Sequence, residues 1–230
     1  MVTALTSIGR IERVTLAERV YAELRDLLMA GELAPGQKLS LRSIAETLGV
    51  SMMPVREAVT RLAADQALKV LPNRAVSVPL MTRAQFQDLT TVRSAIESFA
   101  AEQAALRRSE ASLAATRELH NAFRSEAESP RPQLDQAVRI NKEFHFAIYH
   151  ATGLPPLVSI IVGLWLKIGP VLNFDRKRSE DLLPHGGAAD HHARLVEAIV
   201  ARNSEAARQA LVDDIAGAAA FVESTGRLPL

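Results

Sequence analysis

The sequence predicts a mainly α-helical protein made of a small N-terminal unit, which ends in a β-hairpin, and a larger unit that contains only helices. Aromatic residues make up only 4% of the 230 residues while alanine and leucine dominate, a composition typical of helical proteins. Apolar residues recur at helical spacing over most of the chain. Short runs with the composition of strands occur near residues 68–80, so the hairpin is expected there.

Composition and charge exclude several classes of protein. Hydrophobic residues make up 48% of the chain, which is enough for a folded core. Because the chain contains no cysteine, disulfide frameworks and thiolate chemistry are excluded. The N-terminus lacks the apolar core of a signal peptide, and the most apolar stretch, 156–172, is interrupted by Lys167. We therefore expect a buried helix there, no membrane span, and a cytoplasmic protein. The net charge of +1 does not by itself indicate a nucleic-acid partner.

The first eighty residues predict three helices followed by a hairpin. A loose arm (1–14) precedes a helix at about 15–30. After a turn at "PG", Ser40 caps a short helix that Gly49 ends, and Ser51 caps the third helix only two residues later. The runs "LKVL" and "AVSVPL", joined by "PNR", then predict the hairpin. This order, with so tight a turn between the second and third helices, is the layout of a winged helix-turn-helix.

The third helix has two distinct faces. At about 100° per residue, one apolar stripe is formed by Val55, Ala58, Val59 and Leu62. Met53 and Arg56 project from a different face, and Met52 lies between the two. A helix-turn-helix presents the N-terminal end of this helix to the major groove, where an arginine can bond a guanine edge or a phosphate. We therefore expect DNA contacts from Ser51, Met52, Met53 and Arg56. The alternative for the two methionines is packing in the core or in a dimer interface.

The motif around this helix has a family likeness. After the "PG" turn the chain reads "LRSIAETLGVSMMPVREAVTRL", and with these residues the segment 21–68 resembles the winged-helix domain of GntR-family bacterial transcription regulators. The resemblance implies DNA contacts at Arg42, Ser51, Met52, Met53, Arg56, Asn73 and Arg74. Two positions depart from the family pattern: Met52 stands where arginine is frequent, and Ala75 stands where the wing usually has glycine. Base recognition would then rest more on apolar contacts, for example to thymine methyl groups.

The rest of the chain predicts helices only. They are expected at roughly 83–107, 111–127, 133–151, 156–173, 187–202 and 204–223. We therefore divide the chain into the N-terminal arm (1–14), the winged helix-turn-helix (15–80), a short linker (81–84) and an all-helical domain (85–225).

Three of these helices place a polar residue at the centre of an apolar stripe. The residues are His145, His192 and Asp214, while the neighbouring Asp213 points away. A buried, unpaired carboxylate costs several kcal/mol, so a common ion would explain all three, and imidazole with carboxylate suits Zn²⁺, Ni²⁺, Mn²⁺ or Fe²⁺. The alternative is a hydrogen-bonded polar cluster without metal. His120 and His185 are expected on the surface or in a loop, and His150 projects away from the stripe.

The same half of the chain also has a family likeness. The segments "DLTTVRSAIESFAAEQAA", "NKEFHFAIYHATG" and "HARLVEAIVARNSEAARQALVDDI" resemble the FCD ligand-binding domain of the FadR-like GntR subfamily. Many members bind a divalent metal with a spacing that falls here on Asn141, His145, His192 and Asp214. Asn141 stands where aspartate is usual and Asp214 where histidine is usual, so one anionic ligand is kept on a different helix. Asn141 is then a weak ligand or bonds a metal-bound water.

Arg93 also points inward, with Glu97 one turn later on the same helix. Either the two form a structural ion pair, or Arg93 grips the carboxylate of an effector beside the metal. The leading hypothesis is a homodimeric, ligand-responsive regulator, with repression as the default, that binds palindromic double-stranded operator DNA, a divalent metal (zinc, nickel or manganese) and a small carboxylate. One alternative is a regulator with a purely structural metal or polar cluster and no effector. A metal-dependent hydrolase or lyase is a remote alternative, because the chain has no H-E-x-x-H motif and such an enzyme has no use for the winged helix.

Overall fold

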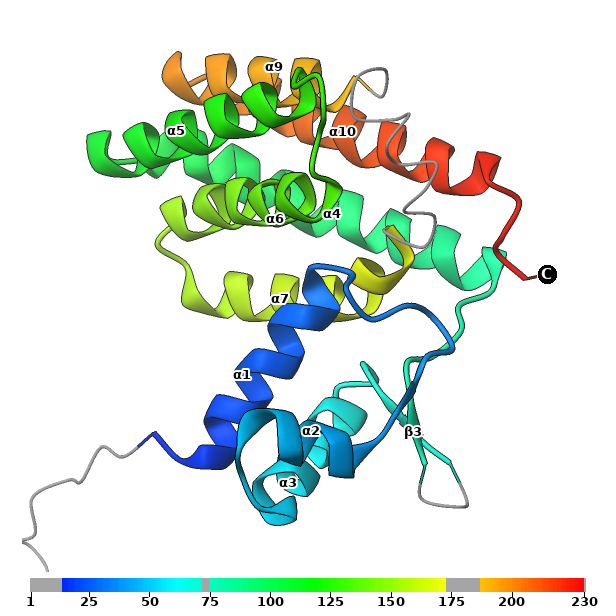
Figure 1. The fold of residues 1–230 in the computed structure, drawn as a ribbon. Coiled ribbons are helices and arrows are strands. Elements are labelled where there is room, and N and C mark those ends of the chain that lie inside the picture. Colours follow the sequence, from blue (N-terminus) through cyan, green and yellow to red (C-terminus); the bar gives the residue numbers. More distant parts are fainter. Residues whose placement is uncertain (1–13, 72–74, 173–186, 230) are drawn as a thin grey trace, which may run out of the picture.

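The computed structural model describes residues 14–71, 75–172 and 187–229, and it consists of a small N-terminal unit below a larger helical one (Figure 1). The elements of the small unit are α1 (Leu16–Met29), β1 (Lys38–Leu39), α2 (Leu41–Leu48), α3 (Met52–Ala64), β2 (Lys69–Val70) and β3 (Val76–Ser77). The sequence predicted the three helices and the β2–β3 hairpin. The strand β1 was not predicted, because it has only two residues; it pairs antiparallel with β3 and completes a sheet of order β1-β3-β2.

Local signals explain where these helices begin and end. Thr15 and Glu18 form a reciprocal capping box at the start of α1. Ser40 accepts a hydrogen bond from the backbone of Ser43 at the start of α2, and Gly49 ends that helix with a φ of 63° that favours glycine. The prediction that Ser51 caps α3 is wrong in one respect. Ser51 occupies the N-cap position, but its side chain makes no capping hydrogen bond.

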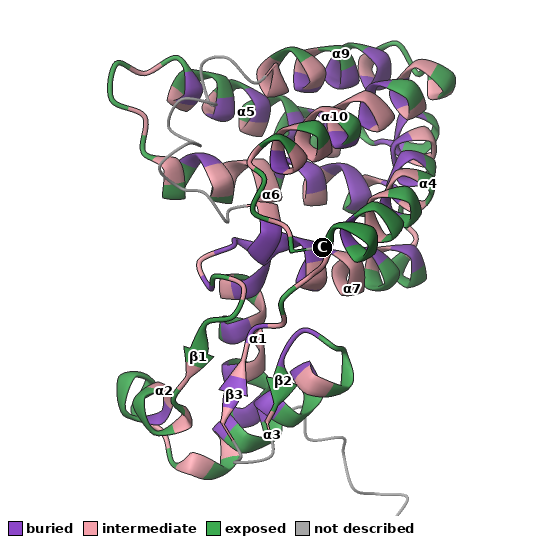
Figure 2. Ribbon diagram, turned by 90° about the vertical axis from the view of Figure 1, so that its right-hand side faces the viewer, coloured by how far each residue is buried: buried purple, intermediate pink, exposed green. Residues whose placement is uncertain are grey.

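The larger unit is built from helices close to the predicted ranges. They are α4 (Arg83–Arg107), α5 (Glu110–Ala127), α6 (Leu134–Ala151), α7 (Pro155–Leu172), α9 (Ala188–Val200) and α10 (Ser204–Ser224). The long helix α4 packs along α10, while α5 packs against α6 and α9. Figure 2 shows buried positions on the inward sides of these helices and exposed positions on the outer turns of α4.

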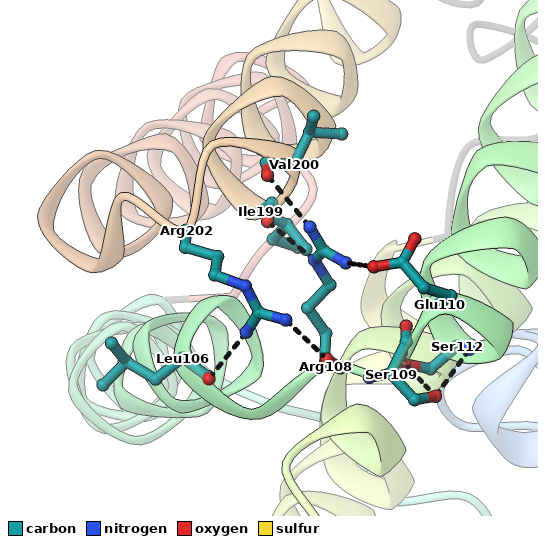
Figure 3. Close-up of polar contacts among 8 residues, drawn as sticks. All are labelled: Leu106, Arg108, Ser109, Glu110, Ser112, Ile199, Val200 and Arg202. Carbon is teal, nitrogen blue, oxygen red and sulfur yellow. Dashed lines mark hydrogen bonds and ion pairs between the residues drawn. The ribbon is translucent and has the colours of Figure 1, made fainter.

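The corner between α4 and α5 is tied to the end of α9 by two arginines (Figure 3). The guanidinium of Arg108 donates to the carbonyls of Ile199 and Val200 at 3.2 and 3.1 Å, and it also pairs with Glu110. In return, Arg202 donates to the carbonyls of Leu106 and Arg108 at 2.9 and 3.3 Å. Each arginine thus satisfies carbonyls at the C-terminus of the other's helix, where a cation is favourable. This fixes the position of α9, which carries His192.

The two units meet where α1 crosses α7. A Cβ added at Gly169 of α7 would lie 2.4 Å from the carbonyl oxygen of Leu28 and 2.8 Å from the Cα of Met29, so only glycine permits this backbone approach. By length and composition α7 is a helix that could cross a membrane. However, it buries Ile161, Trp165 and Leu166 inside the protein, as the sequence predicted for a core helix.

Candidate metal centre and nucleic-acid interface

The faces predicted for α3 are those found in the structure. The four residues of the apolar stripe are buried, whereas Arg56 is exposed and the side chain of Met53 is 72% exposed. Met52 is half-buried and packs against the core, so one methionine of the pair fills space and the other faces solvent. The exposed first turn of α3 therefore offers an apolar group and a cation one turn apart.

The other residues expected to contact DNA lie around this helix. Arg42 is 85% exposed at the start of α2, where its Nε lies 3.2 Å from a carboxylate oxygen of Glu46. Ser51 is exposed, and its hydroxyl makes no capping hydrogen bond to α3. Asn73 and Arg74, the predicted wing contacts, lie outside the described residues.

The three polar residues predicted to converge do lie together. His145 on α6, His192 on α9 and Asp214 on α10 each offer one ligand atom, and these atoms all lie within 4.8 Å of one another. Nε2 of His145 is 3.4 Å from one carboxylate oxygen of Asp214, and Nε2 of His192 is 3.7 Å from the other. Ligands about 2.1 Å from a tetrahedral ion stand about 3.4 Å apart. The spacing therefore fits a shared cation.

His192 provides the strongest test of this fit. Its side chain is fully buried between Phe144 and Phe123, with ring centroids 4.1 and 4.7 Å away. Neither of its ring nitrogens has a hydrogen-bond partner among the described residues. Buried polar groups without partners are rare in folded proteins. A cation bound by the lone pair of Nε2 would give a partner to one of these two nitrogens. The donor set therefore fits a divalent metal.

The electrostatics of the cluster also favour a cation. Burial lowers the pKa of His145 to about 3 and holds the pKa of His192 well below its ordinary value, so both rings are neutral with a lone pair to offer at neutral pH. Burial raises the pKa of Asp214 to about 7, although the charge of Arg93 acts against this rise. A nearby cation favours the ionised carboxylate. Binding of a metal would therefore displace whatever proton Asp214 holds.

A second polar group beside the cluster was only partly predicted. Glu97 is fully buried and accepts hydrogen bonds from Nε of Arg93 at 2.6 Å, from the hydroxyl of Tyr149 at 2.5 Å and from Nε1 of Trp165 at 3.1 Å. The sequence predicted the Arg93–Glu97 pair but not the contacts of Glu97 with Tyr149 and Trp165. Tyr149 also lies 3.4 Å from Nδ1 of His145. It thus connects the buried carboxylate to a ring whose other nitrogen faces Asp214, and such outer contacts orient ligating histidines.

A cavity of about 150 Å³ opens beside these groups. Its polar lining consists of Arg93, Asn141, His145 and Asp214, and apolar residues such as Trp165 and Phe221 complete it. Ligand pockets are usually roughly 300–1,000 Å³. This cavity is smaller than that range, so it would admit only a small molecule, whose polar end could contact the polar lining residues.

The remaining histidines are placed differently. The prediction that His120 lies on the surface or in a loop is wrong: it is buried on α5, its ring centroid lies 6.3 Å from that of Phe144, and its Nδ1 has no partner in the described part of the chain. His120 follows Leu113 by seven residues and Thr116 by four, so the helical period of α5 places it on the same buried face. His150 is exposed as predicted, and His185 lies outside the described residues.

Both units of the chain match known protein families. Residues 16–78 match the model of the bacterial regulatory proteins of the gntR family, and residues 88–217 match the FCD domain. The chain is 30% identical over 207 residues to the HTH-type transcriptional regulator McbR of Escherichia coli (strain K12), covering 89% of this chain and 91% of that protein.

Two solved structures and a further relative are also similar to this chain. The structure of E. coli McbR/YncC superposes with a TM-score of 0.85 at 29% identity, covering 94% of this chain and 100% of that one. A putative GntR regulator from Rhodococcus sp. RHA1 shares the fold, with a TM-score of 0.71 at 23% identity over 90% of this chain and 97% of that one. The HTH-type transcriptional repressor RspR of E. coli (strain K12) is 29% identical over 128 residues, 56% of this chain and 55% of that protein. These proteins and families are regulators, so the hydrolase or lyase alternative is set aside.

Proposed function

This chain belongs to the GntR family of bacterial transcription regulators with an FCD domain, and we propose that it is a cytoplasmic homodimeric repressor controlled by a small carboxylate beside a divalent metal. The observation that carries the proposal is the cavity in which Arg93, His145 and Asp214 meet. The proposal has four parts: contact with DNA, dimerisation, metal binding and effector binding.

The DNA contact is proposed for the first turn of α3. Arg56 is exposed there and lies off the buried stripe, so it is free to bond a base edge or a phosphate. Met53 would give an apolar contact in the same groove. Ser51 and Arg42 flank this surface, and the wing residues Asn73 and Arg74 are proposed to join it by analogy with the family.

Dimerisation is proposed through the outer face of α4. Val92, Phe99 and Leu106 recur every seventh residue, and they are 48%, 40% and 50% exposed. A seven-residue repeat of apolar groups on a long helix is the pattern by which two helices pack together. A second copy of this chain would cover it, and two winged helices would then meet two half-sites of a palindromic operator.

The metal is proposed to bind His145, His192 and Asp214, with Asn141 at the margin of the cavity as a weak fourth ligand or a partner for bound water. A divalent ion supplies a positive charge that an effector oxygen can contact. With Asp214 ionised and the Arg93–Glu97 pair neutral overall, the site has a surplus of one positive charge. A singly charged carboxylate would balance it.

A regulator without a small effector is the alternative, and one observation favours it. Arg93 already gives Nε and Nη2 to Glu97, at 2.6 and 3.2 Å, so the pair has the geometry of a structural bridge. The two functions differ in the role of the cavity. An effector must enter it, whereas a structural metal leaves it without a role.

The test combines DNA binding with calorimetry. Wild-type protein should bind a palindromic fragment from the region upstream of its own gene in fluorescence anisotropy, and one of a series of small organic acids should weaken that binding. Ala218 lines the cavity and is not a proposed ligand, so Ala218→Trp would fill the cavity while leaving His145, His192 and Asp214 unchanged in identity. This variant should keep DNA and metal binding and lose the response to the acid. If the acid acts on Ala218→Trp as on the wild type, the effector binds elsewhere.

A further inference from the structure

A larger cavity lies at the junction of the two units, apart from the candidate metal centre. It has a volume of about 630 Å³, is open to solvent, and is lined by the second half of α1, by α6 and by the first turns of α7. Because α1 belongs to the DNA-binding unit while α6 and α7 belong to the helical unit, anything bound here touches both. The proposed function gives this cavity no role.

The walls of this junction cavity are mostly apolar. Met29 comes from α1, Phe146 from α6, and Val158 and Val162 from α7. Val158, Val162 and Phe146 are partly buried and pack against the main core, so they form a fixed surface rather than loose side chains. Such a wall would hold a hydrocarbon or aromatic group, with about 25 cal/mol gained for each Å² of apolar surface removed from water.

The rim carries more positive than negative charge. Nη2 of Arg25 and Nζ of Lys142 lie 3.3 and 3.9 Å from the same carboxylate oxygen of Asp26. The side chain of Lys142 is only 16% exposed, and 3.9 Å is too long for a hydrogen bond. Nε of Arg25 is enclosed and has no hydrogen-bond partner within the described ranges. Two cations therefore share one carboxylate, and both have donors to spare.

We propose that the junction cavity is a second ligand site, which binds an amphipathic organic monoanion. The anionic group would sit between Arg25 and Lys142, and the apolar group would lie against Phe146, Val158 and Val162. Cationic donors that are partly removed from water bind an anion more strongly than exposed ones do. The charge balance selects one negative charge, because the two cations already share the charge of Asp26.

Met29 gives this site a way to affect the other one. It lines the junction cavity and also the cavity beside the metal centre, and its backbone lies against Gly169 of α7. A ligand in either cavity would therefore lie against the same residue. Occupancy of the junction cavity would favour one placement of α1 on the helical unit, and the two ligands would then alter each other's affinity by the same factor.

The experiment uses alkyl sulfonates, whose charge does not depend on pH, in isothermal titration calorimetry with the full-length protein stripped of metal. Octane-1-sulfonate should bind, with an affinity that rises by roughly threefold to fourfold per added methylene from butane- to octane-1-sulfonate. The neutral 1-octanol should bind at least about tenfold more weakly, which is the loss expected for one charge-assisted hydrogen bond. Equal binding of octanol and octane-1-sulfonate would overturn the assignment of the cations.

Two charge variants should change octane-1-sulfonate binding in opposite directions, and a third serves as a control. Lys142→Gln should weaken octane-1-sulfonate binding by roughly tenfold, whereas Asp26→Asn should strengthen it because it frees both cations. The matched control is Arg139→Gln, which lies one turn before Lys142 on α6 and pairs with Glu32 across the same junction at 3.5 Å but does not line the cavity. It should leave binding unchanged. An equal loss in Arg139→Gln and Lys142→Gln would mean that only general surface charge attracts the sulfonate.

Two filling variants separate this site from the cavity beside the metal. Val158→Trp should abolish octane-1-sulfonate binding, while Ala218→Trp, which fills the other cavity, should leave it intact. The reverse result would place the ligand beside the metal and overturn this inference without touching the proposed function. A thermal scan of each variant confirms that it is folded, and Lys142→Gln provides the decisive measurement if Val158→Trp does not fold.

Discussion

Replacing His192 by leucine should change stability in opposite directions with and without metal. In the metal-free protein His192 has two buried ring nitrogens without hydrogen-bond partners in the described structure, and each such group costs about 1–3 kcal/mol. Leucine has a similar volume and no polar atom. The substitution gives up the ring contacts with Phe144 and Phe123, which are worth about 0.5–1.5 kcal/mol each. The metal-free variant should thus be about 1–3 kcal/mol more stable than the metal-free wild type.

Metal should reverse this order. An ion that binds only the folded protein stabilises it by about 2.7 kcal/mol when its free concentration is 100 times Kd. For a chain of this length, 1 kcal/mol corresponds to a change in Tm of roughly 2–4 °C. The wild type should therefore gain about 5–11 °C with metal. His192→Leu should gain much less, because only His145, Asp214 and the weak ligand Asn141 remain.

Scanning calorimetry at neutral pH, after treatment with a chelator and with zinc, nickel or manganese added, measures both effects. His150→Leu is the matched control, because His150 is an exposed histidine on the same helix as His145. It should respond to metal as the wild type does. If the metal-free His192→Leu protein melts several degrees below the wild type and no metal raises the Tm of either, His192 belongs to a hydrogen-bonded polar cluster and the site is not a metal site.

Three further substitutions test other parts of the structure. Arg56→Ala should weaken operator binding by roughly 1–3 kcal/mol in fluorescence anisotropy. Arg61→Ala is the control on the same helix and should have a smaller effect, because the guanidinium of Arg61 stacks 4.2 Å over the ring of Tyr21. Equal losses would refute the placement of α3 on DNA. Glu97→Gln leaves the buried Arg93 without a counter-charge and should lower the free energy of unfolding by roughly 3–5 kcal/mol. A loss under about 1 kcal/mol is that of an exposed ion pair and would contradict the role of Glu97 as the buried partner of Arg93. Arg108→Ala removes donors from two helix-end carbonyls and should cost about 1–3 kcal/mol in urea unfolding, while the neighbouring exposed Arg107→Ala serves as the control.

Local signals carried the sequence prediction of the fold. Capping residues and glycine at the helix ends set the limits of α1 and α2, and the 3.6-residue period separated the buried stripe of α3 from Met53 and Arg56. The same period found His145, His192 and Asp214, because a polar residue in the middle of an apolar stripe stands out without knowledge of its neighbours. Their convergence was a hypothesis that only the packing of α6, α9 and α10 could settle, and in the structure the three side chains meet.

Contacts between distant residues were not predictable in the same way. Glu97 receives hydrogen bonds from side chains 52 and 68 residues away, and neither tyrosine nor tryptophan is unusual in an apolar stripe. The pairing of β1 with β3 depends on two residues that have no strand pattern of their own. Ser51 has the right identity for a cap, yet its hydroxyl is left unused in capping, since identity alone does not fix the side-chain rotamer.

The position of α1 links these observations to regulation. Its N-terminal part packs against α3, which carries the exposed Arg56, while its C-terminal end lies on Gly169 and presents Met29 to both cavities. A rigid helix transmits a displacement of one end to the other, whereas the short segment between β3 and α4 has no helix to do so. A ligand that changes the packing around Met29 would therefore shift α3 through α1. In the proposed homodimer, two half-sites would have to be met about 34 Å apart or at a multiple of that spacing, so a small rotation of each α1 would weaken operator binding.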